Sequence, residues 1–486
     1  MTSEVAFEHL QKLLDAQRAA QAADPIPDVA TRRNRIDRLV ASVLEHGTEL
    51  AEALDADFGG RPHTTSLELD ILSGLAGIAS VRDQLEEWMR TTELSAGMGG
   101  AIPTVVQHRP KGVVGVIGPW NFPVLLALVP AVEALAAGNR VMIKFSDVVP
   151  LTGEVFARAV SSRMSPEEVT VVNGGLRTAT AFSDLRFDHI FFTGSPKVGR
   201  VVAEAAGRNL VPVTLELGGK NPAVVAPDAD IADAAARIAA GRLINNGQVC
   251  LCPDYAFVPA ASRDVFVEAY KEAVFAHFPT FVDNEDVVSM VNGANHARVT
   301  GLIQDAKNKG ATEVVIVPDD EKERALDATS KRIPPTILLD TPSDAEINRE
   351  EIFGPVLVIH TYDAIDEAIR YVAASEHPLS SYWYGADTAE FRRFLCDTNS
   401  GGVSRNDTAL AYLNHSAPFG GVGMSGSGAY HGKSGFETFS HQRTVAQSDL
   451  PIVVASALIA PLTSNRIEGA TAALAGAVAD VASRLT

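Results

Sequence analysis

Two of the three cysteines in the chain, Cys250 and Cys252, are separated by one residue in the segment GQVCLCPDY (247–255). A structural zinc site needs four ligands, usually in paired spacings, and no second Cys or His pair lies nearby. Redox pairs normally have the spacing Cys-x-x-Cys, which is missing here. The preceding Asn-Asn-Gly-Gln is typical of a loop, where reactive groups are common, but free cysteines are also often buried in cores. A nucleophilic thiol and a pair of small core residues therefore both remain open.

Three polar side chains stand where β-rich runs end. Asn121 lies in GPWNFP, Lys144 ends VMIK, and Glu216 lies in TLELGGKNP. An amide between two prolines can donate to a developing oxyanion, a strand-end carboxylate suits a general base, and a lysine there can meet ribose or phosphate. The alternatives are an Asn in a Pro-rich turn, a solvated glutamate and a lysine that reaches out to solvent.

Two segments are rich in glycine. Gly194-Ser-Pro-Lys-Val-Gly199 follows the strand-like HIFFT and opens a helix, where backbone N–H groups favour anions. It is not Gly-x-Gly-x-x-Gly, and no acidic residue stands clearly about 20 positions on, so its spacing alone is a weak dinucleotide signal. The segment PFGGVGMSGSGAYHGKSGF (418–436) is either a tight loop over a ligand or partner or a flexible insert.

The elements that would position these residues alternate between strand and helix. Residues 1–90 show helical periodicity, and the pattern changes after GMGGAIP (97–103). Strands are expected at 113–118, 140–146, 169–175, 189–195 and 211–219, with a helix at 124–139 after the first of them. A second series from about residue 220 has helices at 230–244 and 262–277 and strands at 255–260, 313–318 and 355–362. Such alternation predicts parallel sheets covered by helices.

Composition excludes some classes of function. A net charge of −19 argues against a broad nucleic-acid surface, which needs clustered Lys and Arg. Three cysteines in 486 residues make no disulfide framework and favour a cytoplasmic location. The first residues lack the basic segment followed by an apolar segment that a secretory signal has. The apolar run 450–462 is too short to span a membrane, so it is expected to be a docking segment. The following stretch to Thr486 predicts a weakly amphipathic helix.

Together these segments resemble the aldehyde dehydrogenase superfamily over nearly the whole chain. The motifs that carry the resemblance occur in the family's order: PWNFP (119–123), VMIKFSD (141–147), FTGSPKVG (192–199), LELGGKNP (215–222), GQVC (247–250), EEIFGPV (350–356) and PFGGVGMSG (418–426). Within the family, the chain resembles the class 3 and coniferyl aldehyde dehydrogenase branch in the segments GQVCLCPDY and SGSGAYHGKSGFETFSHQR. A weaker resemblance to the same branch lies in DFGGR (57–61) and LEEWM (85–89).

The resemblance implies a role for each matching residue. Cys250 corresponds to the nucleophile, Glu216 to the general base and Asn121 to the amide that holds the oxyanion, whereas Cys252 receives no catalytic role. No metal site is implied. The residues implied in cofactor binding are Trp120, Lys144, Asp147, Gly194, Ser195, Gly199, Glu351 and Phe353.

One departure concerns the cofactor. The family often has Lys-Pro-Ser-Glu where this chain has Lys-Phe-Ser-Asp (144–147). An acidic group near the ribose 2′-hydroxyl repels a 2′-phosphate, so NAD is the expected cofactor. Asp147 is one methylene shorter than the usual glutamate, which leaves room for NADP.

The implied reaction is oxidation of an aldehyde to a carboxylic acid through a Cys250 thiohemiacetal and thioester, with Glu216 activating water for hydrolysis. Alternatives are transfer of the acyl group to coenzyme A, a non-catalytic protein on the same fold, and a membrane-associated fatty-aldehyde enzyme that uses 450–462. The branch suggests an aromatic aldehyde, such as coniferyl aldehyde, or a medium-chain one. A homodimer or homotetramer is expected, without nucleic-acid or membrane partners.

The expected fold is α/β, with a Rossmann-type cofactor domain, an α/β catalytic domain and a small oligomerisation flap. The expected boundaries are 1–216 for the helical N-terminus and the dinucleotide-binding domain, 217–405 for the catalytic domain, and 406–486 for the Gly-rich loop and C-terminal oligomerisation or docking segment.

Overall fold

The computed structural model describes residues 4–97, 102–325, 331–448 and 464–484. The chain forms two compact units. The first contains Met1–Arg90 and His108–Gln442, and the second contains Thr91–Gln107 and Arg443–Thr486. The apolar run 450–462, expected to be a docking segment, lies outside the described residues.

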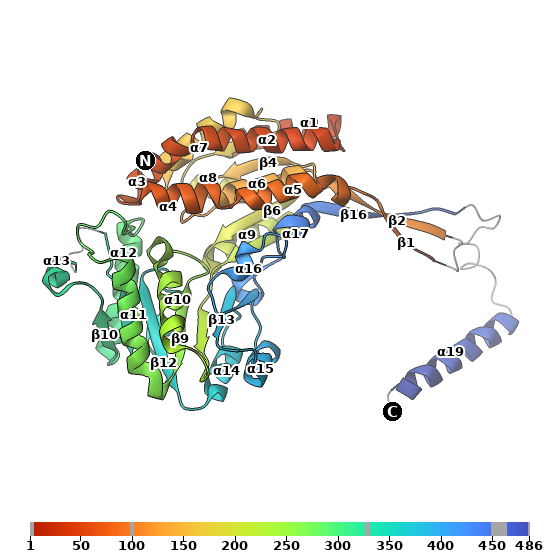
Figure 1. Cartoon of the computed structure of the whole chain (residues 1–486). Coiled ribbons are helices and arrows are strands. Elements are labelled where there is room, and N and C mark those ends of the chain that lie inside the picture. Colours follow the sequence, from red (N-terminus) through yellow and green to blue (C-terminus); the bar gives the residue numbers. More distant parts are fainter. Residues whose placement is uncertain (1–3, 98–101, 326–330, 449–463, 485–486) are drawn as a thin grey trace. The chain divides into compact units, whose positions relative to one another are not determined.

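The first unit contains a six-stranded sheet (Figure 1). Its strands, in spatial order, are β15 (Gly426–Ser427), β7 (Val213–Leu217), β6 (His189–Gly194), β3 (Val113–Ile117), β4 (Arg140–Lys144) and β5 (Val169–Val172). All neighbours are parallel except β15, which runs antiparallel to β7. The expected alternation of strand and helix is confirmed here.

Helices cover both faces of this sheet. Val114 and Val116 of β3 pack into one core, and Val113 and Ile117 pack into the other, because successive side chains of a strand point to opposite faces. The first core includes α2 (Val29–Glu45), α3 (Gly47–Phe58), α5 (Leu75–Trp88), α6 (Leu125–Ala136) and α7 (Pro150–Arg163). The second core includes α1 (Phe7–Ala23), α8 (Leu176–Ser183) and α9 (Pro196–Arg208).

The order of the strands creates a switch point. The chain runs outward from β3 through β4 to β5, and then returns to place β6 and β7 on the opposite side of β3. In open parallel sheets, ligands bind beyond the carboxyl ends of the strands at such a point. The loops after β3 and β6 begin there, and the first of them carries Asn121.

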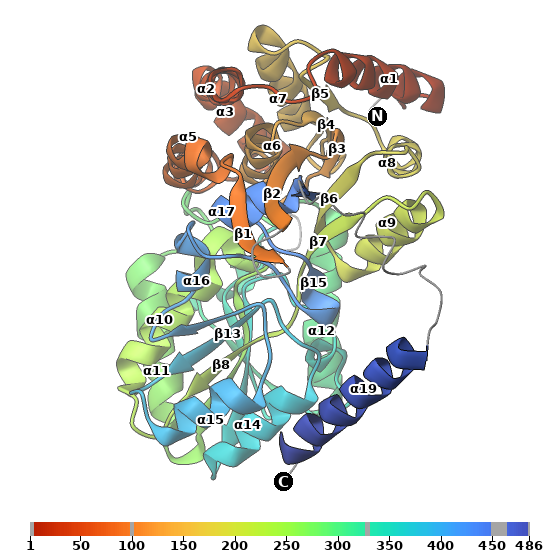
Figure 2. The same cartoon turned by 90° about the vertical axis from the view of Figure 1, so that its right-hand side faces the viewer.

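A second sheet of seven strands lies in the same unit (Figure 2). Its spatial order is β10 (Thr312–Val315), β11 (Thr336–Leu339), β12 (Val356–Tyr362), β9 (Pro253–Pro259), β8 (Asn221–Val225), β13 (Ser380–Tyr384) and β14 (Gly402–Arg405). Only the edge strand β10 runs antiparallel to its neighbour.

Both faces of the second sheet are also covered. One core contains α10 (Ile231–Leu243) and α11 (Arg263–His277), and the other contains α12 (Gly293–Lys309), α14 (Ile365–Ala374) and α15 (Ala389–Asp397). The strands therefore carry nearly continuous apolar runs, as expected for buried parallel strands. The remaining short helices of this unit are α4 (His63–Thr65), η1 (Ser66–Leu72), η3 (Ile244–Gly247), η4 (Ala260–Ser262), η5 (Asp319–Glu321), α13 (Lys322–Ala325), η7 (Glu346–Asn348), α16 (Leu410–Leu413), η8 (Gly423–Ser425) and α17 (Gly432–Thr438).

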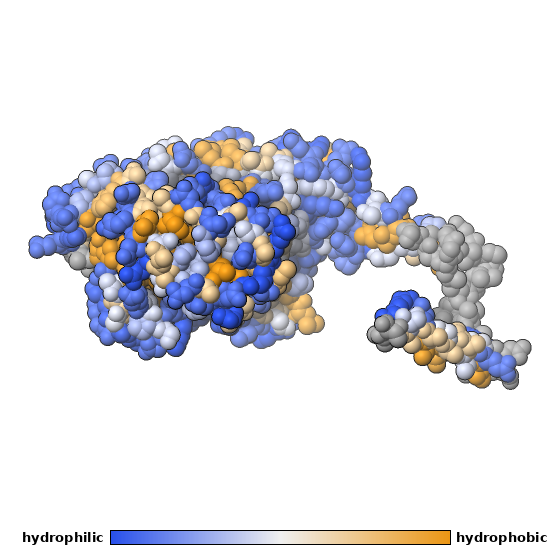
Figure 3. Space-filling view, turned by 60° about the horizontal axis from the view of Figure 1, so that its bottom comes forward, coloured by the Kyte–Doolittle hydropathy of each residue, from blue (hydrophilic) through white to orange (hydrophobic). Residues whose placement is uncertain are grey.

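The second unit is built around a three-stranded sheet, in the order β1 (Thr92–Gly97), β2 (Ile102–Pro110) and β16 (Ser440–Ala446). The expected C-terminal helix is present as α19 (Ser464–Arg484). The exposed large apolar residues of α19 are Ile467, Leu474, Val478 and Val481. Figure 3 shows apolar and polar surface side by side on this helix. Among the described residues, no helix has the length and apolar character needed to cross a membrane.

The α/β fold class is confirmed, whereas the boundaries at 216/217 and 405/406 stay predictions. The Gly-rich segment 418–436 has defined local structure: Phe419 and Tyr430 form an antiparallel bridge, β15 pairs with β7, and α17 follows. This segment brings residues from near the C-terminus to the carboxyl end of β7, where Glu216 lies.

Candidate active site

Cys250 lies in a loop whose backbone is tightly constrained. η3 ends at Gly247, and Asn245, Asn246 and Gly247 have φ values of 49°, 52° and 77°. A Cβ atom at Gly247 would lie 2.1 Å from the carbonyl oxygen of Gly354, so no other residue fits there without a shift. Left-handed conformations are uncommon for residues with a Cβ, and their clustering marks a loop that the surroundings hold in place.

Gln248 ties this loop to its neighbours. Its Nε2 donates to the carbonyl oxygens of Asn245 and Ser289, at 3.0 and 3.1 Å, and its Oε1 accepts from the N–H of Val291 at 3.0 Å. The side chain is fully buried. It was not among the predicted site residues, although it stands inside the quoted GQVC motif.

The two cysteines have different surroundings. Cys252 is buried, and its Sγ donates to the carbonyl oxygen of Gly241 at 3.1 Å. Cys250 is partly exposed. Desolvation raises the pKa of the Cys250 thiol, and the negative charges of Glu351 and then Glu216 raise it further. The charges of two of the predicted carboxylates therefore act on the thiol of Cys250.

Glu216 is a buried strand residue, so it is not a solvated strand-end glutamate. It pairs with Thr193 on β6 and with Gly426 on β15, and only 4% of it is exposed. Within the described residues, neither carboxylate oxygen has a hydrogen-bond partner. Burial raises its pKa well above the usual value, and the charge of Glu133 acts in the same direction. A carboxylate whose pKa is raised binds a proton more strongly than an ordinary carboxylate.

The Asn121 amide points into the same loop. Its Nδ2 donates to the carbonyl oxygen of Gln248 at 3.1 Å. Because a primary amide has two N–H groups, a second donor remains after this bond. The backbone carbonyl of Asn121 accepts from Arg61 Nη1 at 2.8 Å.

Arg61 belongs to a buried ion pair that sequence reasoning missed. Its guanidinium lies 3.6 Å from the carboxylate of Asp70, and both side chains are fully buried. Asp70 Oδ1 also accepts from the N–H of Leu125 at the start of α6, at 2.9 Å. The pair therefore joins the segment 61–70 to the middle of the Asn121 loop and to the start of α6. Arg61 is the last residue of DFGGR (57–61), a segment that resembles the family, but no local sequence pattern predicted that it is buried.

The predicted cofactor residues follow strands of the six-stranded sheet. Lys144, at the end of β4, is buried, and its Nζ donates to the carbonyl oxygen of Phe145 at 2.6 Å. Burial lowers its pKa. Asp147 is exposed. Ser195 caps the N-terminus of α9 by accepting from the N–H of Val198 at 3.4 Å.

The glycines of this region allow close packing. A Cβ at Gly199 would lie 2.7 Å from Leu217, so α9 approaches β7 closely because residue 199 has no side chain. Likewise, a Cβ at Gly194 would lie 2.6 Å from the ring of Phe192. The helix start that Ser195 caps follows directly after β6.

The remaining predicted cofactor-binding residues are Glu351, Phe353 and Trp120. A Cβ at Gly218 would lie 2.1 Å from the carboxylate of Glu351, so Glu351 packs directly on the backbone after β7. Burial and then the charge of Asp254 raise the pKa of Glu351 to about 8. The rings of Trp120 and Phe353 meet edge to face, with their centroids 5.3 Å apart.

Glu133 is a further residue that sequence reasoning missed. It lies in α6, where every residue is buried, and it is 1% exposed. Burial raises its pKa to about 8. In the sequence, Glu133 stands out only as a single glutamate inside the apolar run 124–139. The periodicity of this run predicted an apolar helix and no functional residue.

The structure thus combines an open α/β sheet with a switch point, a buried carboxylate whose charge acts on a thiol in a constrained loop, and an oriented amide. This combination is typical of an α/β enzyme with its site at the carboxyl ends of the strands. A model of the aldehyde dehydrogenase family matches residues 4–445, so the chain belongs to this family and oxidises aldehydes.

Individual relatives are similar over most of their length. The chain is 43% identical over 444 residues to the "probable coniferyl aldehyde dehydrogenase" of Caulobacter vibrioides, covering 90% of this chain and 91% of that protein. It is 40% identical over 441 residues to the coniferyl aldehyde dehydrogenase of Pseudomonas sp. strain HR199, covering 91% of each.

Solved structures agree with the fold. The substrate-bound state of Staphylococcus aureus AldH has a TM-score of 0.87 and 31% identity, covering 96% of this chain and 99% of that one. An indole-3-acetaldehyde dehydrogenase in complex with NAD+ has a TM-score of 0.83 and 25% identity, covering 92% and 90%.

Proposed function

We propose that this enzyme oxidises an aromatic aldehyde to the carboxylic acid through a covalent adduct on Cys250, and that NAD is its cofactor. The observation that carries the proposal is a buried Glu216, with no partner on either carboxylate oxygen among the described residues, whose charge acts on the Cys250 thiol. A base without competing hydrogen bonds near a thiol is the arrangement that covalent catalysis needs.

The first step forms a bond between Cys250 Sγ and the carbonyl carbon. Because the surroundings raise the pKa of this thiol, it rests in the protonated form and needs a base as it attacks. A water molecule accepts that proton and passes it to solvent, so Glu216 stays available for the hydrolysis step. The aldehyde oxygen becomes an oxyanion, which the free N–H of the Asn121 amide and the backbone N–H of Cys250 stabilise. Loss of one such donor typically raises a barrier by about 2.7–4 kcal/mol.

Hydride loss from the tetrahedral carbon leaves a thioester on Cys250. Glu216 then takes a proton from water while the water oxygen bonds to the acyl carbon. The carbon–sulfur bond breaks, and the carboxylic acid leaves. The presence of a base at this position favours hydrolysis over transfer to coenzyme A.

The residues at the switch point fit a dinucleotide. Among the described residues, the Phe145 carbonyl is the one hydrogen-bond partner of the buried Lys144 ammonium, so two of its N–H groups remain for ribose hydroxyls. The start of α9 offers backbone N–H groups to phosphate, and Glu351 can accept from ribose hydroxyls. NAD, when bound, supplies the acceptor for the hydride that leaves the substrate. The exposed Asp147 favours NAD over NADP less strictly than a longer glutamate would.

Aromatic side chains near Cys250 support an aromatic substrate. Trp120 and Tyr412 are half-buried and pack, like Cys250, on the same core cluster. Tyr412 meets Phe419 edge to face at 5.1 Å, and the Cys250 thiol acts on the ionisation of Tyr412. Flat apolar walls suit a planar ring such as that of coniferyl aldehyde, the substrate in the names of the relatives at 40–43% identity.

The proposal is tested by a panel of aromatic, medium-chain and short aldehydes with NAD and with NADP. We expect the highest kcat/KM for coniferyl aldehyde or a related aromatic aldehyde with NAD, and release of the free acid. Acyl-coenzyme A formed on addition of coenzyme A, or a clear preference for short aliphatic aldehydes, would contradict it. We further propose a homodimer or homotetramer, which light scattering of the purified protein can measure.

A further inference from the structure

The Gly-rich segment lies directly on the carboxylate of Glu216. A Cβ atom at Gly420 would lie 3.0 Å from Glu216 Oε1, so the backbone approaches the carboxylate closely because residue 420 has no side chain. Phe419, next to Gly420, exchanges two backbone hydrogen bonds with Tyr430, at 2.9 and 2.8 Å. The position of this segment therefore decides how much space there is beside the Glu216 carboxylate.

The part of the segment that follows Tyr430 is a strained turn. The φ values of His431 and Gly432 are 78° and 53°. Such a conformation is uncommon for a residue with a Cβ and persists only where the surroundings support it. The His431 ring stacks on Phe419 at 5.3 Å, and within the described residues neither of its ring nitrogens has a hydrogen-bond partner. The side chain of His431 thus supports this turn by packing and not by a hydrogen bond.

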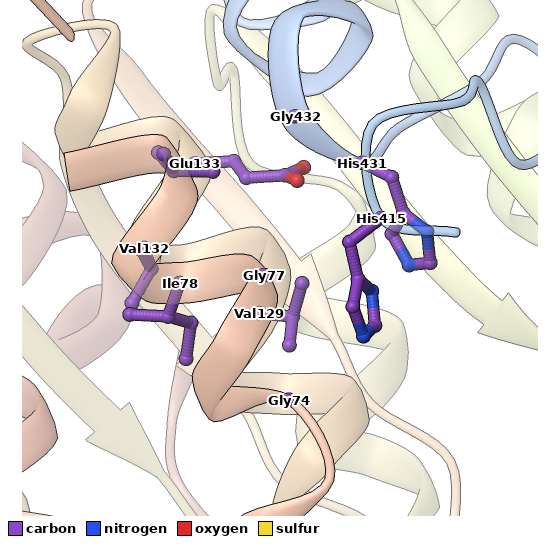
Figure 4. Close-up of a pocket in the computed structure, with 10 residues that line it drawn as sticks. Gly74, Gly77, Ile78, Val129, Val132, Glu133, His415, His431 and Gly432 are labelled. Atoms are coloured by element: carbon purple, nitrogen blue, oxygen red, sulfur yellow. The ribbon is translucent and has the colours of Figure 1, made fainter. Parts of the chain in front are cut away.

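Glu133 of α6 lies against this turn. In Figure 4 its carboxylate points toward Gly432 and His431. A Cβ at Gly435 would lie 1.9 Å from Glu133 Oε2, so the carboxyl group occupies the space that a side chain at position 435 would fill. The backbone N–H groups of His431 and Gly432 stabilise the charged form of Glu133 and so oppose the effect of burial on its pKa. The carboxyl group therefore meets both this turn and the first turn of α17.

A small cavity is lined by Glu133 and by the imidazoles of His415 and His431 (Figure 4). Its volume is about 10 Å³, which is about the space that one water needs. Among the described residues, Glu133 Oε2 has no hydrogen-bond partner. Buried polar groups are normally satisfied, and a water in this cavity would have this oxygen and the His431 ring as partners.

The helix that carries Glu133 is a firm support. Every residue of α6 is buried, so a carboxyl group in this helix is costly unless polar groups meet it. Asp70 holds the N–H of Leu125 at the start of the same helix, close to the Asn121 loop. One helix thus borders the Asn121 loop at its start and contacts the Gly-rich segment through Glu133.

We propose that Glu133 is a positioning residue that anchors the turn His431–Gly432 and so keeps the Gly-rich segment in place on the Glu216 carboxylate during hydrolysis of the thioester. The inference rests on the proposed function, because Glu216 activates water in that step. Glu133 does not touch the substrate and transfers no proton. It acts through the backbone, which the hydrogen bonds between Phe419 and Tyr430 connect to Gly420.

The first test compares Glu133→Ala with Glu133→Gln. Alanine removes the group that meets the turn, whereas glutamine keeps its shape and an oxygen that accepts from N–H. We expect the rate constant for decay of the thioester, measured by rapid quench and mass spectrometry, to fall about tenfold in Glu133→Ala, since small misplacements of reacting groups have at least this effect. Formation of the thioester, followed as NADH in the first turnover, should keep its rate.

Glu133→Gln should restore the decay to within about twofold of the wild-type enzyme, because the contact with the turn is kept. Equal falls of formation and decay in Glu133→Ala, an unchanged decay, or no restoration in Glu133→Gln would overturn the proposal. If the wild-type enzyme forms no thioester, the proposed function fails instead.

Gly435→Ala tests the same contact from the other side. Its methyl group would lie 1.9 Å from Glu133 Oε2 and should displace the carboxyl group, so the decay should again slow by about tenfold. In the Glu133→Ala background this methyl group enters vacated space, so Gly435→Ala should add no further loss. Lys433→Ala is the matched control, because Lys433 is exposed on α17, and it should leave the decay unchanged. Additive losses in the double variant would contradict the contact.

Discussion

Cys250 and Cys252 are separated by one residue, but their sulfur atoms have different surroundings. The Cys252 thiol is buried and donates to the carbonyl of Gly241. The Cys250 thiol is partly exposed and lies within the influence of Glu216 and Glu351. Accessibility and a nearby base distinguish a reactive cysteine from a structural one.

Exchange of each cysteine for serine separates these roles. Cys250→Ser should abolish oxidation of every aldehyde, because a hydroxyl is a far weaker nucleophile than a thiol in this site. Cys252→Ser should keep kcat within about twofold, since a hydroxyl can still donate to Gly241 and such a small change seldom disturbs a distant reacting atom. The initial rate of NADH formation measures both variants. Activity retained in the first and lost in the second would mean that the other sulfur reacts.

The loops at the carboxyl ends of strands are held by contacts from distant elements. Arg61 lies just after α3 and fixes the carbonyl of Asn121, while its partner Asp70 fixes the start of α6. Gly247 lets the Cys250 loop approach Gly354. The active-site loops are thus positioned by packing rather than by their own sequence.

Removal of Arg61 should affect both stability and activity. Arg61→Ala leaves Asp70 buried without a cation, which typically costs about 3–5 kcal/mol. A double variant, Arg61→Met with Asp70→Asn, removes the unpaired charge and should recover much of that stability while kcat stays low, because the Asn121 carbonyl still lacks the 2.8 Å bond from Arg61. Calorimetry and steady-state kinetics measure the two effects. Full recovery of kcat in the double variant would show that Arg61 does not position Asn121.

A methyl group at Gly247 should disrupt the nucleophile loop. It would lie 2.1 Å from the Gly354 carbonyl, and the φ of 77° is unfavourable for alanine. We expect Gly247→Ala to lose at least about 100-fold in kcat/KM, since small misplacements of reacting groups have effects of this size. Gly301→Ala is the matched control: nothing lies near its Cβ position in α12, and alanine should stabilise the helix by up to about 1 kcal/mol. Equal activities of the two variants would contradict the steric argument.

The molecule as a whole divides into a large unit with both sheets and a small unit with a three-stranded sheet and α19. The described side chains of α19 are exposed, and the helix carries apolar residues such as Leu474 and Val478. Its folding therefore contributes little burial within one chain.

Truncation after residue 448 tests this independence. We expect the main thermal transition of the truncated protein to stay within about 4 °C of the full chain, the shift that roughly 1 kcal/mol would produce in a domain of modest size. Differential scanning calorimetry measures it. A much larger fall would mean that the removed segment is covered in the assembled protein, which agrees with the expected oligomer but not with an independent helix.

At this scale, local patterns predicted much of the fold. Strands such as 113–118 and 140–146 could be predicted because apolar β-branched runs alternate with helices. The parallel pairing of these two strands then brings Asn121 and Lys144 to the same edge of the sheet. Glu133 and the cavity at His431 could not be predicted, because their burial depends on segments about 300 positions apart, as in the contact of Glu133 with Gly435. Arg61 could not be predicted either, because its partners Asp70 and Asn121 belong to other elements. The cytoplasmic location and the oligomeric state stay predictions.

The most direct test of the central claim is intact-protein mass spectrometry of Glu216→Gln after mixing with aldehyde and NAD. Without its base for hydrolysis, this variant should accumulate the thioester, seen as a gain of one acyl group that peptide mapping assigns to Cys250. The wild-type enzyme should show no lasting adduct. No adduct in an otherwise folded, NAD-binding variant, or an adduct on Cys252 or Cys396, would contradict the account.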